Sequence, residues 1–254
     1  MILPTPTSWA VDLLKVDIQK PEPCTMVPPS IAMTCHYRDK AQTDKAIESL
    51  FDTTPEVKKV LVIDTSIEQD YTHQDPRVKI INLPNGLHSD GVNLGLQYLY
   101  RTQMSRKDKR VLLMDSDVEF TAPIPMLPEG VLVGRIIDKR CRPEGTEDIN
   151  KVWLSVLQRV HPCFCVIDYG FLHTHKIPFM DWSRISEENK LILGHNPKAD
   201  AMDNPKYPAI RAAQKSAWYD VGSTMYADVV AAGGKVTHFD WSGFMRHKIG
   251  GSWR

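Results

Sequence analysis

The sequence has no excess of charge of either sign, and it contains little cysteine. Its 254 residues include 31 Lys and Arg and 31 Asp and Glu, so the formal net charge at pH 7 is zero. A neutral chain has no overall field that would draw it to nucleic acid, so any site for a polyanion has to be a local patch. The 5 cysteines do not suit a disulfide framework in a chain of this length, and they predict a reducing compartment: the cytoplasm, or the host cytoplasm if the protein is viral.

Long hydrophobic runs are also missing from the sequence. No stretch reaches the roughly 18 apolar residues of a membrane span. The opening residues, MILPTPTSWAVDLLKV, lack the basic and apolar regions of a signal peptide. We find no internal repeat and no low-complexity tract. The sequence therefore predicts a chain without a membrane span.

What the sequence does contain is a regular alternation of apolar runs and amphipathic segments. Apolar runs of strand length are followed by segments with apolar residues at helical spacing, such as Val92, Leu96 and Leu99. We expect strands within 30–37, 58–66, 78–84 and 109–117, and helices within 39–51 and 91–104. This order predicts an α/β fold with a Rossmann-like, mostly parallel central sheet and helices on both faces. Ligands bind such sheets at the carboxyl ends of the strands.

The second half of the sequence has fewer clear elements. We expect one strand within 123–137, another within 160–172, and a last helix within 218–236 that stops at Gly233 and Gly234. The length suits a single domain, 1–254. We divide this domain into a proline-rich extended lead-in (1–29), a first half (30–120) and a second half (121–254).

The stretch VLLMDSDVEF, residues 111–120, ends an apolar strand with two aspartates, Asp115 and Asp117. Carboxylates repel each other and are costly to bury unpaired, so we expect a positive partner nearby. Side chains two residues apart on an extended segment point to the same side, where both can approach one Mg²⁺ or Mn²⁺ ion. The alternative is that Asp115 caps a turn and Asp117 is solvated.

Two enzyme classes carry such a D-x-D motif after an apolar strand. In haloacid-dehalogenase-like phosphatases the motif opens the fold and continues to Thr or Val, whereas here it follows three expected strands and Glu119 stands at that position. In glycosyltransferases of the GT-A fold, the motif ends the fourth strand and holds the metal that bridges the diphosphate of a nucleotide sugar. The position of the motif in this sequence resembles the second class.

Further segments resemble GT-A glycosyltransferases, in the same order along the chain. CHYRD (35–39) resembles the turn after their first strand, VLVIDTS (60–66) a segment whose Asp contacts base or ribose, and NGLHSDGVNLGL (85–96) the segment that leads into the helix before D-x-D. The resemblance implies that the nucleotide sugar is bound by Tyr37, Arg38, Asp64, Asn93 and Asp115. Within this set, Tyr37 and Asp64 would address base and ribose, and Asp115 would contact the metal or the ribose.

The ending RHKIGGSW (246–253) is similar to the carboxyl terminus of glycogenin-like and related galactosyltransferases. This likeness implies that His247 is a metal ligand together with Asp115 and Asp117. It also implies that Lys248 and Gly250 belong to a clamp for the diphosphate. The Lys-Pro pair of that terminus is absent here, so Lys248 has to supply the charge from a different position.

An inverting glycosyl transfer needs a carboxylate that takes the proton of the acceptor hydroxyl. Asp220 stands in a segment, WYDVGSTMY, that is similar to the one near which inverting GT-A enzymes keep this base, and Asp168 and Asp181 are the fallbacks. Asp220 could instead act only as a helix cap. A retaining mechanism does not need this base, and the terminus resembles a retaining family, so both stereochemical outcomes stay open.

Two pairs in the sequence have the spacing of residues that share a strand face. Cys163 and Cys165 are one such pair, and His173 and His175 are the other. No further ligand stands at the spacing of a zinc site for either pair. The sequence therefore favours two small buried side chains at the cysteines.

Together these residues predict a metal-dependent glycosyltransferase that moves a sugar from a nucleotide-diphosphate sugar to an acceptor hydroxyl. Mn²⁺ or Mg²⁺ is the expected cofactor and a UDP-sugar the expected donor; the acceptor is a glycan, a protein, a small molecule or a hydroxymethylated DNA base. The alternatives are a non-catalytic nucleotide-sugar-binding module of the same fold and, less favoured, the phosphatase. A sugar nucleotidyltransferase is disfavoured because no glycine-rich, lysine-containing loop follows the first expected strand.

Overall fold

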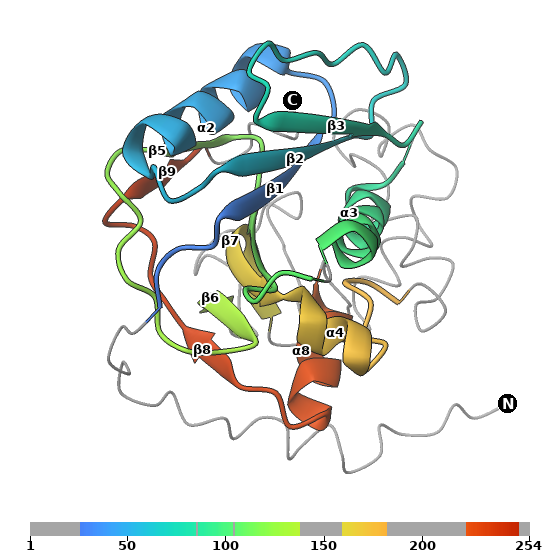
Figure 1. Cartoon of the computed structure of the whole chain (residues 1–254), viewed down its shortest axis with the longest axis vertical. Coiled ribbons are helices and arrows are strands. Elements are labelled where there is room, and N and C mark those ends of the chain that lie inside the picture. Colours follow the sequence, from blue (N-terminus) through green and yellow to red (C-terminus); the bar gives the residue numbers. More distant parts are fainter. Residues whose placement is uncertain (1–25, 85, 104, 138–158, 182–221, 249–254) are drawn as a thin grey trace, which may run out of the picture.

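The secondary structure of the chain is taken from a computed structural model, which describes residues 26–84, 86–103, 105–137, 159–181 and 222–248 (Figure 1). In chain order the elements are β1 (Ile31–His36), α2 (Lys40–Thr53), β2 (Lys59–Asp64), β3 (Val78–Asn82), α3 (His88–Gln103), β4 (Arg110–Met114), β5 (Val118–Phe120), β6 (Leu132–Ile137), β7 (Arg159–Asp168), α4 (Tyr169–Thr174), α8 (Ser223–Ala231), β8 (Val236–His238) and β9 (Met245–His247). In this part of the chain, no helix is long and apolar enough to cross a membrane.

A seven-stranded mixed sheet has the strand order β3-β2-β1-β4-β7-β6-β8. The strands β3, β2, β1 and β4 run parallel to one another. Strand β7 runs antiparallel to both β4 and β6, and β6 runs parallel to β8. The predicted α/β class with a mostly parallel sheet is confirmed. The carboxyl ends of β1, β2 and β4 therefore meet at one edge, which we call the carboxyl edge.

Helices cover both faces of the sheet, each over its own apolar core (Figure 1). Helix α2 packs on one face through buried side chains that include Ile47 and Leu50. Helix α3 packs on the other face, and its Leu99 shares a cluster with Leu172 of α4 and Val229 of α8. The expected helices on both faces are therefore present, and their packing fixes the position of the sheet and of its carboxyl edge.

Helix α3 lies close to the sheet because two of its glycines face the strands. A Cβ at Gly95 would lie 2.1 Å from Sδ of Met33, and a Cβ at Gly91 would lie 2.9 Å from Sγ of Cys35. Only glycine permits this approach without a shift of the neighbouring atoms. The helix begins at His88, three residues before the segment in which we expected it, and so brings His88 to the carboxyl edge. There the thiol of Cys35 contacts the carbonyl oxygen of His88 at 3.6 Å.

Strand β7 contains a bulge. Opposite it, Gly134 of β6 pairs with Cys165 and Ile136 pairs with Val160, so a two-residue step along β6 matches a five-residue step along β7. The bulge interrupts the alternation of side chains. As a result, Cys163 belongs to the core on the α2 face and Cys165 to the core on the α3 face. The prediction that the two cysteines share one face is wrong.

Several element ends follow from local capping. Helix α2 starts after Asp39, whose carboxylate accepts a hydrogen bond from the N–H of Gln42 at 3.0 Å. Helix α8 ends before Gly233, which has a φ of 77°, as the sequence predicted.

The stretch 160–172, expected as a strand, changes to helix partway along. Strand β7 ends at Asp168, and α4 begins with Tyr169. The carboxylate of Asp168 accepts the N–H of Phe171 at 3.0 Å and so caps the helix. Residues 1–25 of the expected lead-in lie outside the described residues, and the division into two halves stays a prediction.

Candidate metal and nucleotide site

Asp115 and Asp117 occupy the short turn that leaves the sheet at the carboxyl edge. Strand β4 ends at Met114 and β5 begins at Val118, so both carboxylates lie between the two strands. The side chain of Asp115 is 18% exposed and that of Asp117 only 1%. Two carboxylates with so little access to water have to be compensated by positive charge or hydrogen-bond donors.

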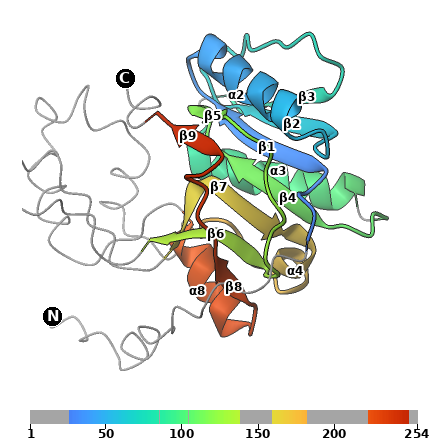
Figure 2. The same cartoon turned by 90° about the vertical axis from the view of Figure 1, so that its left-hand side faces the viewer.

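Strand β9 brings a histidine to this turn from more than 120 residues further along the chain. Strands β5 and β9 pair antiparallel, with Val118 opposite His247, and they lie side by side (Figure 2). Nε2 of His247 lies 3.1 Å from Oδ1 of Asp117 and 3.6 Å from Oδ2 of Asp115. The N–H of Lys248 donates to the carbonyl oxygen of Asp117 at 2.9 Å, which fixes the two segments against each other. The structure thus brings together the three residues that the sequence proposed as metal ligands.

A second histidine, His88, was not among the sequence-based candidates. Its Nε2 atom lies 3.7 Å from Oδ1 of Asp115, is buried, and has no hydrogen-bond partner among the described residues. His88 is the first residue of α3, and the close packing of that helix places it here. His88 lies within NGLHSDGVNLGL (85–96), the segment that resembles GT-A enzymes, but that resemblance assigned a role to Asn93 and none to this histidine.

The ionisation of these groups reflects negative charge held away from water. Burial raises the pKa of Asp115, and the charge of Asp117 raises it further, while His88 and His247 oppose the shift. Burial acts to lower the pKa of His247, but the hydrogen bond to Asp117 and the charges of both carboxylates outweigh it, so that pKa is raised. A cation bound here would compensate the negative charge that the two buried carboxylates carry.

The donor set at the turn fits a divalent cation. Asp115, Asp117 and His247 each offer one ligand atom, and these atoms all lie within 4.8 Å of one another. Carboxylate oxygens are the preferred ligands of Mg²⁺ and Mn²⁺, and an imidazole nitrogen is accepted more readily by Mn²⁺. The residues present therefore suit a divalent cation of the predicted class.

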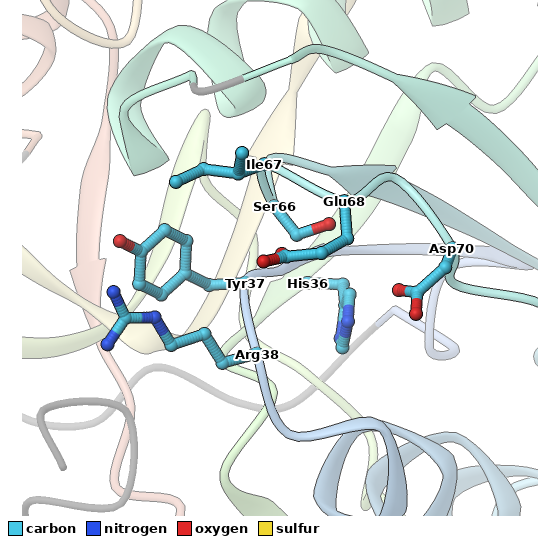
Figure 3. Close-up of a pocket in the computed structure, with 7 residues that line it drawn as sticks. All are labelled: His36, Tyr37, Arg38, Ser66, Ile67, Glu68 and Asp70. Carbon is cyan, nitrogen blue, oxygen red and sulfur yellow. The ribbon is translucent and has the colours of Figure 1, made fainter.

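A pocket of about 330 Å³ lies at the same edge of the sheet, after β1 and β2 (Figure 3). Strand β1 lies beside β4 in the sheet, so the pocket and the D-x-D turn share the carboxyl edge. The guanidinium carbon of Arg38 lies 4.7 Å from the centre of the Tyr37 ring. Both residues, predicted to bind the nucleotide sugar, line this pocket. The full lining is His36, Tyr37, Arg38, Ser66, Ile67, Glu68 and Asp70.

Asp64 does not line this pocket, but it binds the lining residue Ser66. Its carboxylate is fully buried and accepts hydrogen bonds from the N–H and the hydroxyl of Ser66, at 2.9 and 2.6 Å. It also accepts the N–H of Tyr71 at 3.2 Å. These bonds hold the loop that follows β2 in its shape. The predicted contact of Asp64 with base or ribose stays a prediction.

Asn93 connects α3 to the segment 179–181 through two hydrogen bonds of its side chain. Its side-chain oxygen accepts the N–H of Phe179 at 2.7 Å, and its amide nitrogen donates to the carbonyl oxygen of Met180 at 3.0 Å. The N–H of Asp181 donates to the hydroxyl of Thr224 at 3.1 Å. The segment 179–181 is therefore held between α3 and α8. The predicted contact of Asn93 with the nucleotide sugar stays a prediction.

The candidate bases and the clamp residues lie in different places. Asp168 pairs with Arg110 at the start of β4, which is the opposite edge of the sheet from Asp115. Asp220 and Gly250 lie outside the described residues, and α8 begins after Gly222 without a side-chain cap. Lys248 is described, and its side chain is exposed directly after His247.

Comparisons with known proteins give a likeness in structure alone. No protein-family model matches the chain, and no curated protein matches it in sequence. The chain is similar to the galactosyltransferase LgtC in complex with donor and acceptor sugar analogues, with 12% identity, a TM-score of 0.43, and coverage of 82% of this chain and 72% of that one. It is also similar to an active-site mutant of LgtC (12% identity, 82% and 72% coverage, TM-score 0.40). A third match is 4-diphosphocytidyl-2C-methyl-D-erythritol synthase (13% identity, 61% and 82% coverage, TM-score 0.35). No residue role is carried over at these values.

Proposed function

We propose that the protein is a metal-dependent glycosyltransferase of the GT-A type, which moves a sugar from a nucleotide-diphosphate sugar to an acceptor hydroxyl. The observation that carries the proposal is the convergence of Asp115, Asp117 and His247 at the carboxyl edge, the same edge as the pocket lined by Tyr37 and Arg38. This edge is where open α/β sheets bind their ligands. A D-x-D turn that follows the fourth strand supports the same assignment.

The proposal divides the work between the two halves of a single domain. Residues 30–120 would bind the nucleotide sugar, because the pocket and the D-x-D turn belong to them. Residues 121–254 would bind the acceptor and supply His247 as a ligand of the metal. Lys248 and Gly250 would belong to the diphosphate clamp. A UDP-sugar is the proposed donor.

In this reaction the residues of the chain have distinct tasks. Asp115, Asp117 and His247 would hold Mn²⁺ or Mg²⁺, which when bound neutralises charge on the departing diphosphate. The exposed ammonium group of Lys248 follows directly on His247 and is available to a phosphate oxygen. Tyr37 and Arg38 offer a ring face and a planar guanidinium to the base and ribose.

A base for an inverting transfer is assigned to Asp220. The variant Asp220→Asn is expected to lower turnover by about 10² to 10⁴, the usual contribution of a general base. Donor affinity should change little, because the carboxylate acts on the acceptor and not on the nucleotide. Steady-state rates measure the first effect, and NMR of the product shows whether the anomeric configuration inverts. Full activity in a folded Asp220→Asn variant would remove Asp220 as the base, and the same substitution at Asp181 would then be tested.

A thermal-shift screen of nucleoside diphosphates and their sugars, with and without Mn²⁺, tests the function itself. A ligand at about 100 times its dissociation constant raises the free energy of unfolding by about 2.7 kcal/mol. We expect stabilisation that depends on Mn²⁺, followed by release of the nucleoside diphosphate when the nucleotide sugar is incubated with glycan, protein, small-molecule or hydroxymethylated-DNA acceptors. Binding without any turnover would favour the non-catalytic module. Turnover of a generic phosphoester, with none of a nucleotide sugar, would favour a phosphatase.

A further inference from the structure

A second group of ligand atoms lies beside the D-x-D turn and shares only His247 with the proposed glycosyl transfer, which makes no use of its other two members. His161 and Cys163 of β7 and His247 of β9 each offer one ligand atom, and these atoms all lie within 4.8 Å of one another. The two imidazole rings have their centres 5.5 Å apart and are inclined by 78°. Both histidines are half-buried and the cysteine is buried. The group therefore joins the central sheet to the strand that carries the shared histidine.

The bulge in β7 is what forms this group. It turns Cys163 away from the face occupied by Cys165 and into reach of His247. Pro162 lies within the bulge, where its missing N–H costs no ladder hydrogen bond. Across the bulge, Gly134 packs so tightly that a Cβ would lie 2.6 Å from the carbonyl oxygen of Phe164. Bulges commonly re-aim a side chain next to a functional site.

The chemistry of these donors differs from that of the carboxylate pair. We propose that His161, Cys163 and His247 form a second metal site, which takes a zinc-class divalent ion. A thiolate and two imidazoles are the ligands that zinc prefers, whereas Mg²⁺ prefers oxygen. Metal–ligand bonds of about 2.0–2.3 Å in a tetrahedron place the ligand atoms about 3.3–3.7 Å apart, so the side chains have to close by little more than about 1 Å. Three protein ligands leave the fourth position open to water.

His161 is already oriented for this role. Its Nδ1 atom accepts the backbone N–H of Cys163 at 3.1 Å, so Nδ1 is the unprotonated nitrogen and its lone pair points at the backbone of that residue. Metal binding exchanges this hydrogen bond for coordination and releases the proton of the Cys163 thiol to solvent. His247 belongs to both groups, so a zinc-class ion draws it away from Asp115 and Asp117.

Binding of Co²⁺, a spectroscopic substitute for zinc, tests the site without any assay of activity. The parent protein for this test carries the substitutions Cys24→Ser and Cys141→Ser, which remove two other thiols that could bind Co²⁺. Both positions lie outside the described residues. We expect a thiolate-to-cobalt charge-transfer band in the near-ultraviolet absorption of the parent, and we expect Zn²⁺ to abolish the band. Cys163→Ser should lose it. Cys165→Ser is the matched control, because that thiol is also buried on β7 but on the other face, and this variant should keep the band. No band in the parent, or an equal band in Cys163→Ser, overturns the proposal.

Two further variants keep the test decisive if Cys163→Ser does not fold. His161→Asn retains an acceptor for the N–H of Cys163 and removes the imidazole, so the affinity for Co²⁺ should fall by more than about tenfold. Unchanged affinity would overturn the assignment. Asp117→Asn should keep the charge-transfer band at saturating Co²⁺, and its loss would mean that the ion sits at the D-x-D turn and not at a second site. The outcome does not depend on whether the protein transfers sugars.

Discussion

Replacing Asp117 with asparagine tests the proposed metal site most directly. The variant Asp117→Asn keeps the size of the side chain and one oxygen donor, but it removes a negative charge from a position that is only 1% exposed. The neighbouring donor, Nε2 of His247, lies 3.1 Å from the altered carboxylate. A cation shared by these two groups therefore loses one charged ligand and little else.

The size of the effect follows from the distance and the burial. At an effective dielectric constant of about 20, even two unit charges about 4 Å apart interact by about 4 kcal/mol, and a divalent ion in contact with the carboxylate interacts more strongly. An energy of about 4 kcal/mol corresponds to roughly 10³-fold in affinity at about 1.4 kcal/mol per factor of ten. The remaining oxygen of the asparagine and water that enters the site offset part of this loss. We therefore expect the affinity for Mn²⁺ to fall by about 10² to 10³-fold.

Isothermal titration calorimetry with Mn²⁺, on variants shown by circular dichroism to be folded, measures this change. Glu119→Gln is the matched control, because it also removes one negative charge, at a position in β5 that is two residues after Asp117. There Glu119 pairs with Lys45 at 2.8 Å, and both side chains are exposed. Surface pairs contribute little, so the control should bind Mn²⁺ within about threefold of the wild type. Wild-type affinity for Mn²⁺ in a folded Asp117→Asn protein would refute the assignment of the site.

Three other predictions concern the support of the site. Gly134→Ala should lower the free energy of unfolding by about 1–3 kcal/mol in urea melts, because the new Cβ meets a backbone carbonyl oxygen. Gly243→Ala is the control and should leave the free energy of unfolding unchanged, because a Cβ there has no atom within 4 Å; equal effects of the two variants would contradict the tight packing. Asp64→Ala should leave buried N–H groups without an acceptor, at about 1–3 kcal/mol each, and should weaken nucleotide binding in calorimetry; a nucleotide affinity equal to that of the wild type would show that the loop does not shape the pocket. Burial raises the pKa of the Cys35 thiol, so peptide mapping after treatment with a thiol reagent near neutral pH should find Cys35 labelled only in denaturant, and rapid labelling of the folded protein would disprove its burial.

The sequence alone determined most local elements of the first half of the chain and the position of the D-x-D motif. Apolar periodicity is a property of neighbouring residues, so it predicted β1, β2, β4 and α3 and placed Asp115 and Asp117 at the end of a strand. The same pattern, read as alternating strands and helices, predicted the parallel sheet and hence the edge where a ligand binds. The partnership of His247 with these aspartates came from a resemblance at the carboxyl terminus, since no local pattern could supply it.

Tertiary structure decided which distant segments meet. Periodicity shows which side chains face inward, but it does not show what they pack against, because strand register and helix approach depend on the fit of remote surfaces. Glycines that let α3 approach the sheet brought His88 to Asp115, although the sequence had assigned no role to this histidine. A bulge, which is a mismatch between two strands and not a property of either, turned Cys163 away from Cys165 and toward His247.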